Sequence, residues 1–460
     1  MKKKKENLIK GIIYLLISQI FIKVIGLAYK LYLTNKEGFG DEGNAVYSSG
    51  FQIYALLLAF SSTGIPSAIS KLVAERLAVG DTKGAHKIFK IAFITFAIFG
   101  GFGSIILFIG ARKIAINWIQ MPEAENSIIC LSPSIFFVSI ISVFRGYFNG
   151  RQNFTITAKS QSIEQIFKTI LTILLVEIVT HISRNNICVM AGAANLATTI
   201  ATIISFYYVY LYYKIKRPEI GQEIKQTINY KPTRIKKTLK KILSVSIPIS
   251  LSSIISSFNK NIDSFTVVRF LKKIISEDEA KIKYGILSGK IDTLCSVTLS
   301  LNAAFVIVCI PNISKAFMKG DTINTNKIIN IFIIITFILG IPITLLIFFF
   351  PNNIMELLFP NANSGELYLK VSSLCIVFML LNQTISAILQ SIGRVNIPPI
   401  SSTIGILFKF LCNVFLIPNP KFGILGAIIG NIISNVVSCC ISSVALVIAL
   451  NKQKIKGFNT

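Results

Sequence analysis

The chain has 460 residues, of which 53% are hydrophobic, and its mean hydropathy of +0.67 is well above that of an ordinary soluble domain. The apolar residues occur in blocks of about 20, the length that crosses a bilayer, which excludes a soluble fold with one very large core. Lysine and arginine total 47 against 20 aspartate and glutamate residues, a formal charge of +27. Most of this charge lies in short loops between apolar blocks, which argues against a nucleic-acid-binding protein.

The apolar blocks predict twelve transmembrane helices. They cover, in chain order, residues 8–33, 44–64, 85–110, 126–148, 161–182, 187–212, 239–270, 285–312, 327–350, 366–390, 397–418 and 424–450. Residues 213–238 are polar and basic, and we interpret them as a cytoplasmic linker. The predicted fold is therefore an all-α polytopic membrane protein with six-helix bundles over 1–212 and 239–450 and a tail over 451–460.

Basic residues are distributed unevenly between the two sets of loops. An even number of spans places both termini on the same side, and the loops on that side hold roughly three times as many lysine and arginine residues as the others. The segment Lys214–Lys241 alone contributes ten of them. By the positive-inside rule, the sequence predicts a multi-pass protein of the bacterial cytoplasmic membrane with both termini in the cytoplasm.

A series of short motifs occurs once in each half of the chain. Ile65-Pro66, Ser70-Lys71, Gly80-Asp81-Thr82 and Lys87-Ile88 are matched in order by Ile310-Pro311, Ser314-Lys315, Gly320-Asp321-Thr322 and Lys327-Ile328. This order predicts an internal repeat whose axis lies along the membrane normal. Within the motif, residues 66–79 are expected to form a helix that ends at Gly80, with Asp81 or Thr82 as the N-cap of the next helix.

The first apolar block contains charges at a depth where charges are rare. Lys23 and Lys30 share one face of the predicted helix, with Gly26 between them. A cation at mid-membrane costs roughly 2.5–3.5 kcal/mol on insertion scales, and it is tolerated where it faces a water-filled or anionic cavity. We therefore expect Lys23 and Lys30 to line the pathway of a negatively charged substrate.

Further charged residues lie in the seventh and eighth blocks. Lys260 and Asp263 are three residues apart, a spacing that allows a pair on one helical face, and Lys290 lies in the eighth block. We expect Lys260 and Lys290 to contribute to substrate binding and Asp263 to serve as an ion or coupling site. Because lysines outnumber aspartates in these blocks, a shared cavity would favour an anion and repel organic cations.

Charged residues in the fifth and eleventh blocks are explained without a role in substrate binding. Glu164 and Lys168 in the fifth block have the i,i+4 spacing of a closed ion pair, and Glu164 is a second candidate for coupling. Lys409 in the eleventh block is expected to extend its ammonium group to the membrane surface.

Enzymatic chemistry finds no support in the sequence. No P-loop, GxSxG, HExxH or dinucleotide-binding pattern occurs, so we predict neither an enzymatic activity nor a cofactor. The eight cysteines have no CxxC spacing and are expected to be buried apolar side chains rather than metal ligands. Transport is then driven by a gradient of H⁺ or Na⁺, by the membrane potential or by the substrate gradient.

Five stretches of the chain, taken together, resemble the sequence motifs of a known family. They are Ile22–Lys30, Gly38–Tyr47, Gly64–Arg76, Arg145–Gln165 and Tyr284–Gly289. Together they resemble the stage V sporulation protein B family of polysaccharide-biosynthesis membrane proteins, within the exporter superfamily that also includes multidrug exporters and lipid II flippases. The resemblance implies a MATE-like fold, in which two six-helix bundles enclose a central cavity and work by alternating access.

The resemblance also implies a substrate. Basic residues on the first, second and eighth helices of lipid II flippases contact the lipid diphosphate, and the matching positions here support Lys30 most, then Lys23 and Lys290. The second block of this chain departs from that pattern, because it has no arginine or lysine inside the membrane. We expect a flippase for an undecaprenyl-diphosphate-linked saccharide, either a peptidoglycan precursor or a polysaccharide repeat unit, with membrane lipids around the carrier's tail.

Two other functions stay open at this point. An ion-coupled multidrug exporter of the MATE type would be expected to have more carboxylates than lysines inside the membrane, the reverse of the observed pattern. A non-transporting scaffold for envelope or spore-cortex assembly would tolerate neutralisation of every cavity lysine.

Overall fold

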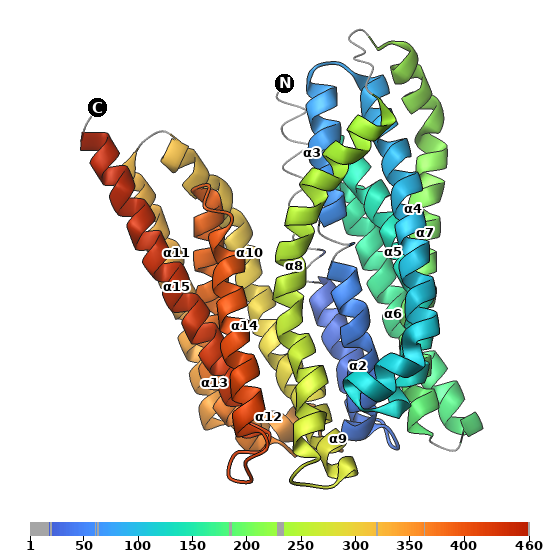
Figure 1. Ribbon diagram of the computed structural model, residues 1–460, viewed down its shortest axis with the longest axis vertical. Helices are drawn as coiled ribbons and strands as arrows, with labels where there is room; N and C mark the ends of the chain where they lie inside the picture. Colours follow the sequence, from blue (N-terminus) through green and yellow to red (C-terminus); the bar gives the residue numbers. More distant parts are fainter. Residues whose placement is uncertain are drawn as a thin grey trace. The chain divides into compact units, whose positions relative to one another are not determined.

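The computed structural model describes residues 18, 21–59, 61, 64–183, 186–227, 234–318, 321–362 and 364–458, and the regular structure in these ranges is helical (Figure 1). Lys260 is among the helical positions whose side chains lie outside the described part. Residues 21–35 are helical, and the longer helices that follow are α2 (Gly40–Ala59), α3 (Ile65–Ala78), α4 (Thr82–Lys113), α5 (Glu125–Gly150), α6 (Phe154–Ser183), α7 (Ile187–Lys225), α8 (Ile235–Leu271), α9 (Glu277–Gly285), α10 (Asp292–Met318), α11 (Thr322–Phe349), α12 (Pro351–Leu358), α13 (Glu366–Ser391), α14 (Ile397–Leu416) and α15 (Leu425–Phe458).

The predicted all-α membrane fold is confirmed. Within the described residues, eight helices are long and apolar enough to cross a membrane, judged by length and composition. The number of twelve spans stays a prediction, since much of the first block lies outside the described residues.

The chain forms two compact units. Unit 1 comprises Met1–Tyr32 and Val46–Ser257, and unit 2 comprises Leu33–Ala45 and Phe258–Thr460. The division falls inside α2 and inside α8, so each of these helices contributes residues to both units. The domain limits predicted from the sequence stay a prediction.

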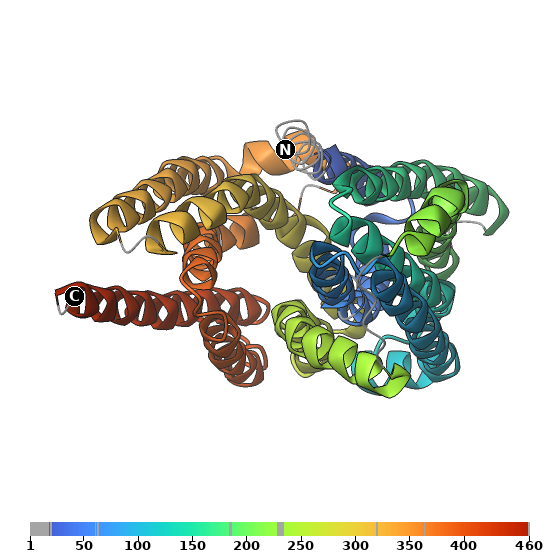
Figure 2. The same ribbon diagram turned by 90° about the horizontal axis from the view of Figure 1, so that it is seen from above.

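The core of unit 1 is rich in aromatic residues. The ring of Phe89 on α4 lies 4.6 Å from the ring of Tyr147 on α5 and 5.1 Å from that of Tyr213 on α7, between ring centroids. These three helices run side by side in Figure 1 and remain adjacent in the perpendicular view of Figure 2. Because aromatic rings bury a large apolar area, this cluster holds the ends of α4, α5 and α7 together.

Unit 2 has a core made of aliphatic side chains. It is built by α10, α11, α13 and α15, and its buried members include Ile329, Ile385, Ile388, Leu389 and Leu446. Ile385, Ile388 and Leu389 follow the i, i+3, i+4 spacing that places them on one face of α13.

The predicted helix boundary at Gly80-Asp81-Thr82 is confirmed, and in the second half the Asp321 cap is seen while Gly320 lies outside the described residues. Gly80 has φ +76°, a conformation that favours glycine after a helix, and the Asp81 carboxylate accepts a 2.7 Å hydrogen bond from the Gly84 backbone amide. Asp321 likewise caps α11 by accepting from the Asn324 amide at 2.9 Å. Before the motif, α3 covers Ile65–Ala78 in the first half and α10 covers Asp292–Met318 in the second.

The end of the sixth span differs from the prediction. The sequence predicts that the helix ends at residue 212, but α7 continues to Lys225 and passes through Pro218. A proline inside a helix removes one backbone hydrogen bond without necessarily ending the helix. Here Ile220 is buried in the core of unit 1 and Ile224 packs against that core, which stabilises the extension.

Candidate functional site

A group of lysine and aromatic side chains lies inside unit 1. The Lys168 ammonium group on α6 is 4.4 Å from the ring centroid of Phe51 and 5.0 Å from that of Tyr29. The Lys30 ammonium group is 4.8 Å from the ring centroid of Tyr47. We refer to Tyr29, Lys30, Tyr47, Phe51 and Lys168 as the cation–aromatic cluster.

The cluster is assembled by three helical segments. Tyr29 and Lys30 belong to the helical residues 21–35, and Tyr47 and Phe51 lie one turn apart on α2, where their rings stack with centroids 5.8 Å apart. The hydroxyl groups of Tyr29 and Tyr47 are 3.4 Å apart and form a hydrogen bond. The aromatic side chains therefore fix the positions of both lysines by contact with the faces of their rings.

Lys168 is a buried cation for which the described part of the chain offers no carboxylate partner. Lys168 is 7% exposed. Its ammonium group contacts aromatic rings, and no carboxylate in the described ranges lies within ion-pair distance of it. The predicted Glu164–Lys168 ion pair is wrong, because Glu164 instead accepts a 2.8 Å hydrogen bond from Arg145 on α5. An unpaired buried charge is costly, so this arrangement is suited to an anion that supplies the missing charge.

Arg145 completes a separate, internally neutral network beside the cluster. Its guanidinium group also donates to the Ser160 hydroxyl at 2.9 Å and to the Ser205 hydroxyl at 3.3 Å. Glu164, predicted as a coupling residue, is thus held by a fixed cation in this structure.

Lys23 lies on the same helical segment as Lys30 and is exposed. Gly26, between the two lysines, faces α6, because a β-carbon placed there would lie 3.5 Å from the amide nitrogen of Gln165. A β-carbon at this position would be in ordinary van der Waals contact with α6.

Lys290, the predicted binding residue of the eighth span, is fully buried in unit 2. Its ammonium group donates to the Asp41 carboxylate at 2.8 Å and to the backbone carbonyl of Ser364 at 3.1 Å, and it also bonds the carbonyl of Ala362. All three ammonium protons therefore have acceptors. The contact joins the first turn of α2, the π-helical residues 286–291 and the chain before α13.

Asp263 and Lys409 form a buried ion pair in unit 2. The Lys409 ammonium group is 2.7 Å from the Asp263 carboxylate, which also accepts a 3.1 Å hydrogen bond from Asn413. The expectation that Lys409 reaches the membrane surface is wrong, since it is 1% exposed. The predicted pairing of Asp263 with Lys260 involves a side chain outside the described part of the structure.

A small cavity of about 10 Å³ lies next to this pair, lined by both Asp263 and Asp292. This volume is about that of one water-sized occupant. Within the described residues, no group of three or more histidine, cysteine, aspartate or glutamate side chains is arranged to hold a metal ion.

Sequence reasoning missed Lys168 as a member of the cluster, because the local i,i+4 rule assigned it to Glu164. A signal was nevertheless available. Phe51 follows Tyr47 by one helical turn, so the second span carries an aromatic stripe at the depth where a buried lysine from another helix needs a partner.

Comparison with protein families gives two matches. A sequence model of the family described as polysaccharide biosynthesis protein matches residues 8–317, and a model described as MatE matches residues 248–415.

Individual relatives cover most of the chain. The lipid II flippase MurJ of Bacillus subtilis is 25% identical over 432 residues, which span 90% of this chain and 78% of that protein. Stage V sporulation protein B of the same organism is 24% identical over 427 residues, 92% of this chain and 80% of that protein. Among solved structures, the inward-facing conformation of a multidrug resistance MATE family transporter of the MOP superfamily aligns with a TM-score of 0.74 at 18% identity, covering 95% of this chain and 99% of that chain. This likeness shows that the fold is MATE-like.

Proposed function

The chain belongs to the polysaccharide biosynthesis protein family, and from this membership we propose that it is a flippase for an undecaprenyl-diphosphate-linked saccharide. It would carry a peptidoglycan precursor or a polysaccharide repeat unit across the bacterial cytoplasmic membrane by alternating access, with both termini in the cytoplasm. Two relatives named for lipid II flipping and for sporulation, each about a quarter identical over most of the chain, support this proposal. No chemical step is part of it.

The cation–aromatic cluster is the observation on which the proposal depends. Lys168 brings a positive charge that no described carboxylate neutralises into the interior of unit 1, and Lys30 lies in the same cluster. A diphosphate is a suitable partner, because lysines contact its oxygens as point donors without needing a fixed fork geometry. An organic cation would be repelled, which argues against multidrug export.

The proposal assigns the diphosphate to Lys23, Lys30 and Lys168. Lys260 stays a proposed contributor from the sequence. Lys290 already has acceptors for all its protons, so in this proposal it contacts substrate only after it leaves Asp41.

The proposed coupling site is the small cavity beside Asp263. Because Lys409 already neutralises Asp263, the second carboxylate, Asp292, is the one left to take up H⁺ or Na⁺. A coupling role for Glu164 requires that its pair with Arg145 opens during the transport cycle.

The test is to measure flipping by purified protein in liposomes that contain a fluorescent undecaprenyl-diphosphate-linked disaccharide. We expect Lys23→Gln and Lys30→Gln each to lower the rate about 10- to 100-fold, which corresponds to the loss of one charge-assisted hydrogen bond of about 1.5–3 kcal/mol. Lys30→Arg should retain most of the activity. Lys327→Gln removes the same charge from an exposed position of α11 and should flip at the wild-type rate.

Three outcomes would contradict the proposal. Wild-type flipping by the Lys23→Gln/Lys30→Gln double variant would show that the two lysines do not hold the substrate. Drug resistance conferred by the protein, without any flipping, would favour a multidrug exporter. Normal envelope assembly in cells whose only copy has both lysines neutralised would favour a scaffold.

A further inference from the structure

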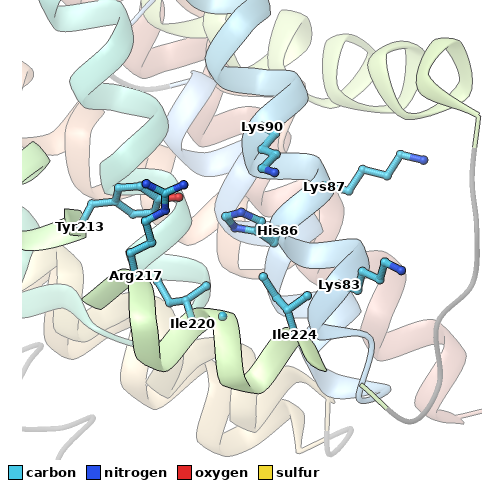
Figure 3. Close-up of a pocket in the computed structure, with 9 residues that line it drawn as sticks. Lys83, His86, Lys87, Lys90, Tyr213, Arg217, Ile220 and Ile224 are labelled. Atoms are coloured by element: carbon cyan, nitrogen blue, oxygen red, sulfur yellow. The ribbon is translucent and has the colours of Figure 1, made fainter. Parts of the chain in front are cut away.

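A basic cavity lies in unit 1 between the first turns of α4 and the last turns of α7, and its lining shares no residue with the cation–aromatic cluster (Figure 3). Its volume is about 540 Å³. It is lined by Lys83, His86, Lys87 and Lys90 from α4 and by Tyr213, Arg217, Ile220, Gly221 and Ile224 from α7.

The cavity results from how the two helix ends are joined. The Thr82 hydroxyl donates to the Glu223 carbonyl at 2.8 Å, and the Lys83 backbone amide donates to the Thr227 hydroxyl at 3.2 Å. Deeper along the helices, the Phe89 ring of α4 lies 5.1 Å from the Tyr213 ring of α7, between ring centroids. The helices are thus held together at their ends and in the aromatic core, and Gly221 between these points leaves open space, since a β-carbon there would meet nothing within 4 Å.

The lining combines a basic wall with an apolar floor. Lys83, Lys87, Lys90 and Arg217 are cationic, whereas no carboxylate contributes to the lining. The two nearby glutamates of α7 are paired elsewhere, Glu219 with Lys216 at 2.7 Å and Glu223 with Arg151 at 2.6 Å. The lining therefore has an excess of basic over acidic residues, which favours an anion.

His86 provides a second observation that points to a ligand. Its Nδ1 atom is buried and has no hydrogen-bond partner among the described residues. In Figure 3 the His86 ring and Arg217 face each other across the cavity, whereas Lys83 and Lys87 extend outward from α4. A ligand in the cavity would lie between the His86 ring and the Arg217 guanidinium group, next to Ile220 and Ile224.

We propose that this cavity binds a phosphate-bearing anion, namely the headgroup of an anionic phospholipid. α4 and α7 both belong to segments that qualify as membrane spans, so the cavity lies at the end of two spans, where lipid headgroups are found. Basic pockets between transmembrane helices on the cytoplasmic side are suited to such headgroups. The apolar floor suits the first carbons of the acyl chains, which a free phosphate lacks.

The experiment is a titration of the purified full-length protein with short-chain phosphatidylglycerol, short-chain phosphatidylcholine or inorganic phosphate, followed by native mass spectrometry. We expect phosphatidylglycerol to bind and the other two to bind at least tenfold more weakly. Arg217→Gln and Lys90→Gln should each weaken binding about fivefold, as expected for one basic residue near a membrane surface. Gly221→Leu should abolish it by filling the cavity.

Two controls separate binding from folding and from general charge. Gly221→Ala adds a methyl group in open space and should fold and bind as wild type. Lys225→Gln removes an exposed charge from the same end of α7 outside the lining and should also bind as wild type. Equal binding of phosphatidylcholine, or unchanged binding by both the Arg217→Gln/Lys90→Gln and Gly221→Leu variants, would overturn the proposal.

Inorganic phosphate binding as tightly as phosphatidylglycerol would also overturn the lipid assignment and identify a soluble anion instead. The flippase proposal is unaffected by either result, because none of the residues that line this cavity belongs to the cation–aromatic cluster.

Discussion

Lys168 illustrates how a single residue can be placed for binding rather than for stability. A cation over an aromatic ring gains about 0.5–2 kcal/mol, whereas an uncompensated buried ion costs several kcal/mol. The rings of Tyr29 and Phe51 therefore offset only part of the cost of burying this ammonium group. The balance favours an interpretation in which an anionic group of the substrate supplies the remaining stabilisation.

Replacement of Lys168 should separate stability from activity. Methionine has a similar length and no charge, so Lys168→Met should leave the thermal unfolding temperature unchanged or raise it, because replacing a buried charge by a well-packed apolar side chain is often neutral or stabilising. The same variant should flip the diphosphate-linked substrate at least tenfold more slowly in liposomes, while Lys168→Arg retains activity. A loss of stability in Lys168→Met together with wild-type flipping would show that Lys168 has only a structural role.

At the scale of elements, α3 and α5 owe their close contact to two glycines. A β-carbon at Gly146 would lie 2.8 Å from the Pro66 carbonyl oxygen, and one at Gly150 would lie 2.8 Å from the Ser70 carbonyl oxygen. The two glycines are four residues apart on α5, the spacing that lets two membrane helices approach closely. The contact positions α3, whose following residues, Gly80 and Asp81, lead into α4.

Two matched glycine substitutions test this contact. Gly146→Ala should destabilise the protein by about 1–3 kcal/mol, the usual cost of adding a methylene group to a well-packed interface. Gly221→Ala makes the same change within α7, where nothing lies within 4 Å, and should be neutral or stabilising because alanine favours the helix over glycine. The measurement is thermal unfolding in detergent. Equal unfolding temperatures for the two variants would contradict tight packing at Gly146.

The elements themselves were largely predictable from the sequence, whereas the partners of their charged residues were not. Apolar blocks and the Gly-Asp-Thr motif indicate where helices lie and where α4 and α11 begin, because periodicity and capping are local properties. Asp263 and Lys409, by contrast, are 146 residues apart, and nothing in a single sequence shows which faces of distant helices meet. The i,i+3 and i,i+4 spacings within one helix therefore predicted pairs of Asp263 with Lys260 and of Glu164 with Lys168.

The end of α7 was also not predictable from local sequence signals. Pro218 and the polar composition around it favour a linker, but Ile220 and Ile224 continue an apolar face one helical turn apart. Only the folded core of unit 1, in which Ile220 is buried, decides that the helix continues. Tertiary packing here overrides the local signal.

At the scale of the whole molecule, the distribution of charge agrees with the proposed orientation in the membrane. The extended end of α7 brings Lys214, Lys216, Arg217 and Lys225 to the same end of unit 1 as Lys83, Lys87 and Lys90 of α4. This end therefore concentrates basic residues, as the positive-inside rule expects of the end that faces the cytoplasm in the proposed orientation. The leaflet assigned to the basic cavity depends on this orientation.

Reporter fusions test the orientation directly. Alkaline phosphatase fused after Gln120, between α4 and α5, should be active because the predicted location is outside the cytoplasm, and the same reporter fused after Thr227 should be inactive. Green fluorescent protein at these two positions should give the opposite pattern, because it fluoresces in the cytoplasm but not after export in an unfolded state. A fusion after Asn361 extends the test to unit 2 and should behave like the Gln120 fusion. Active alkaline phosphatase after Thr227 would reverse the orientation and move the basic cavity to the outer leaflet, where the cytoplasmic surface charge would no longer account for its basic lining.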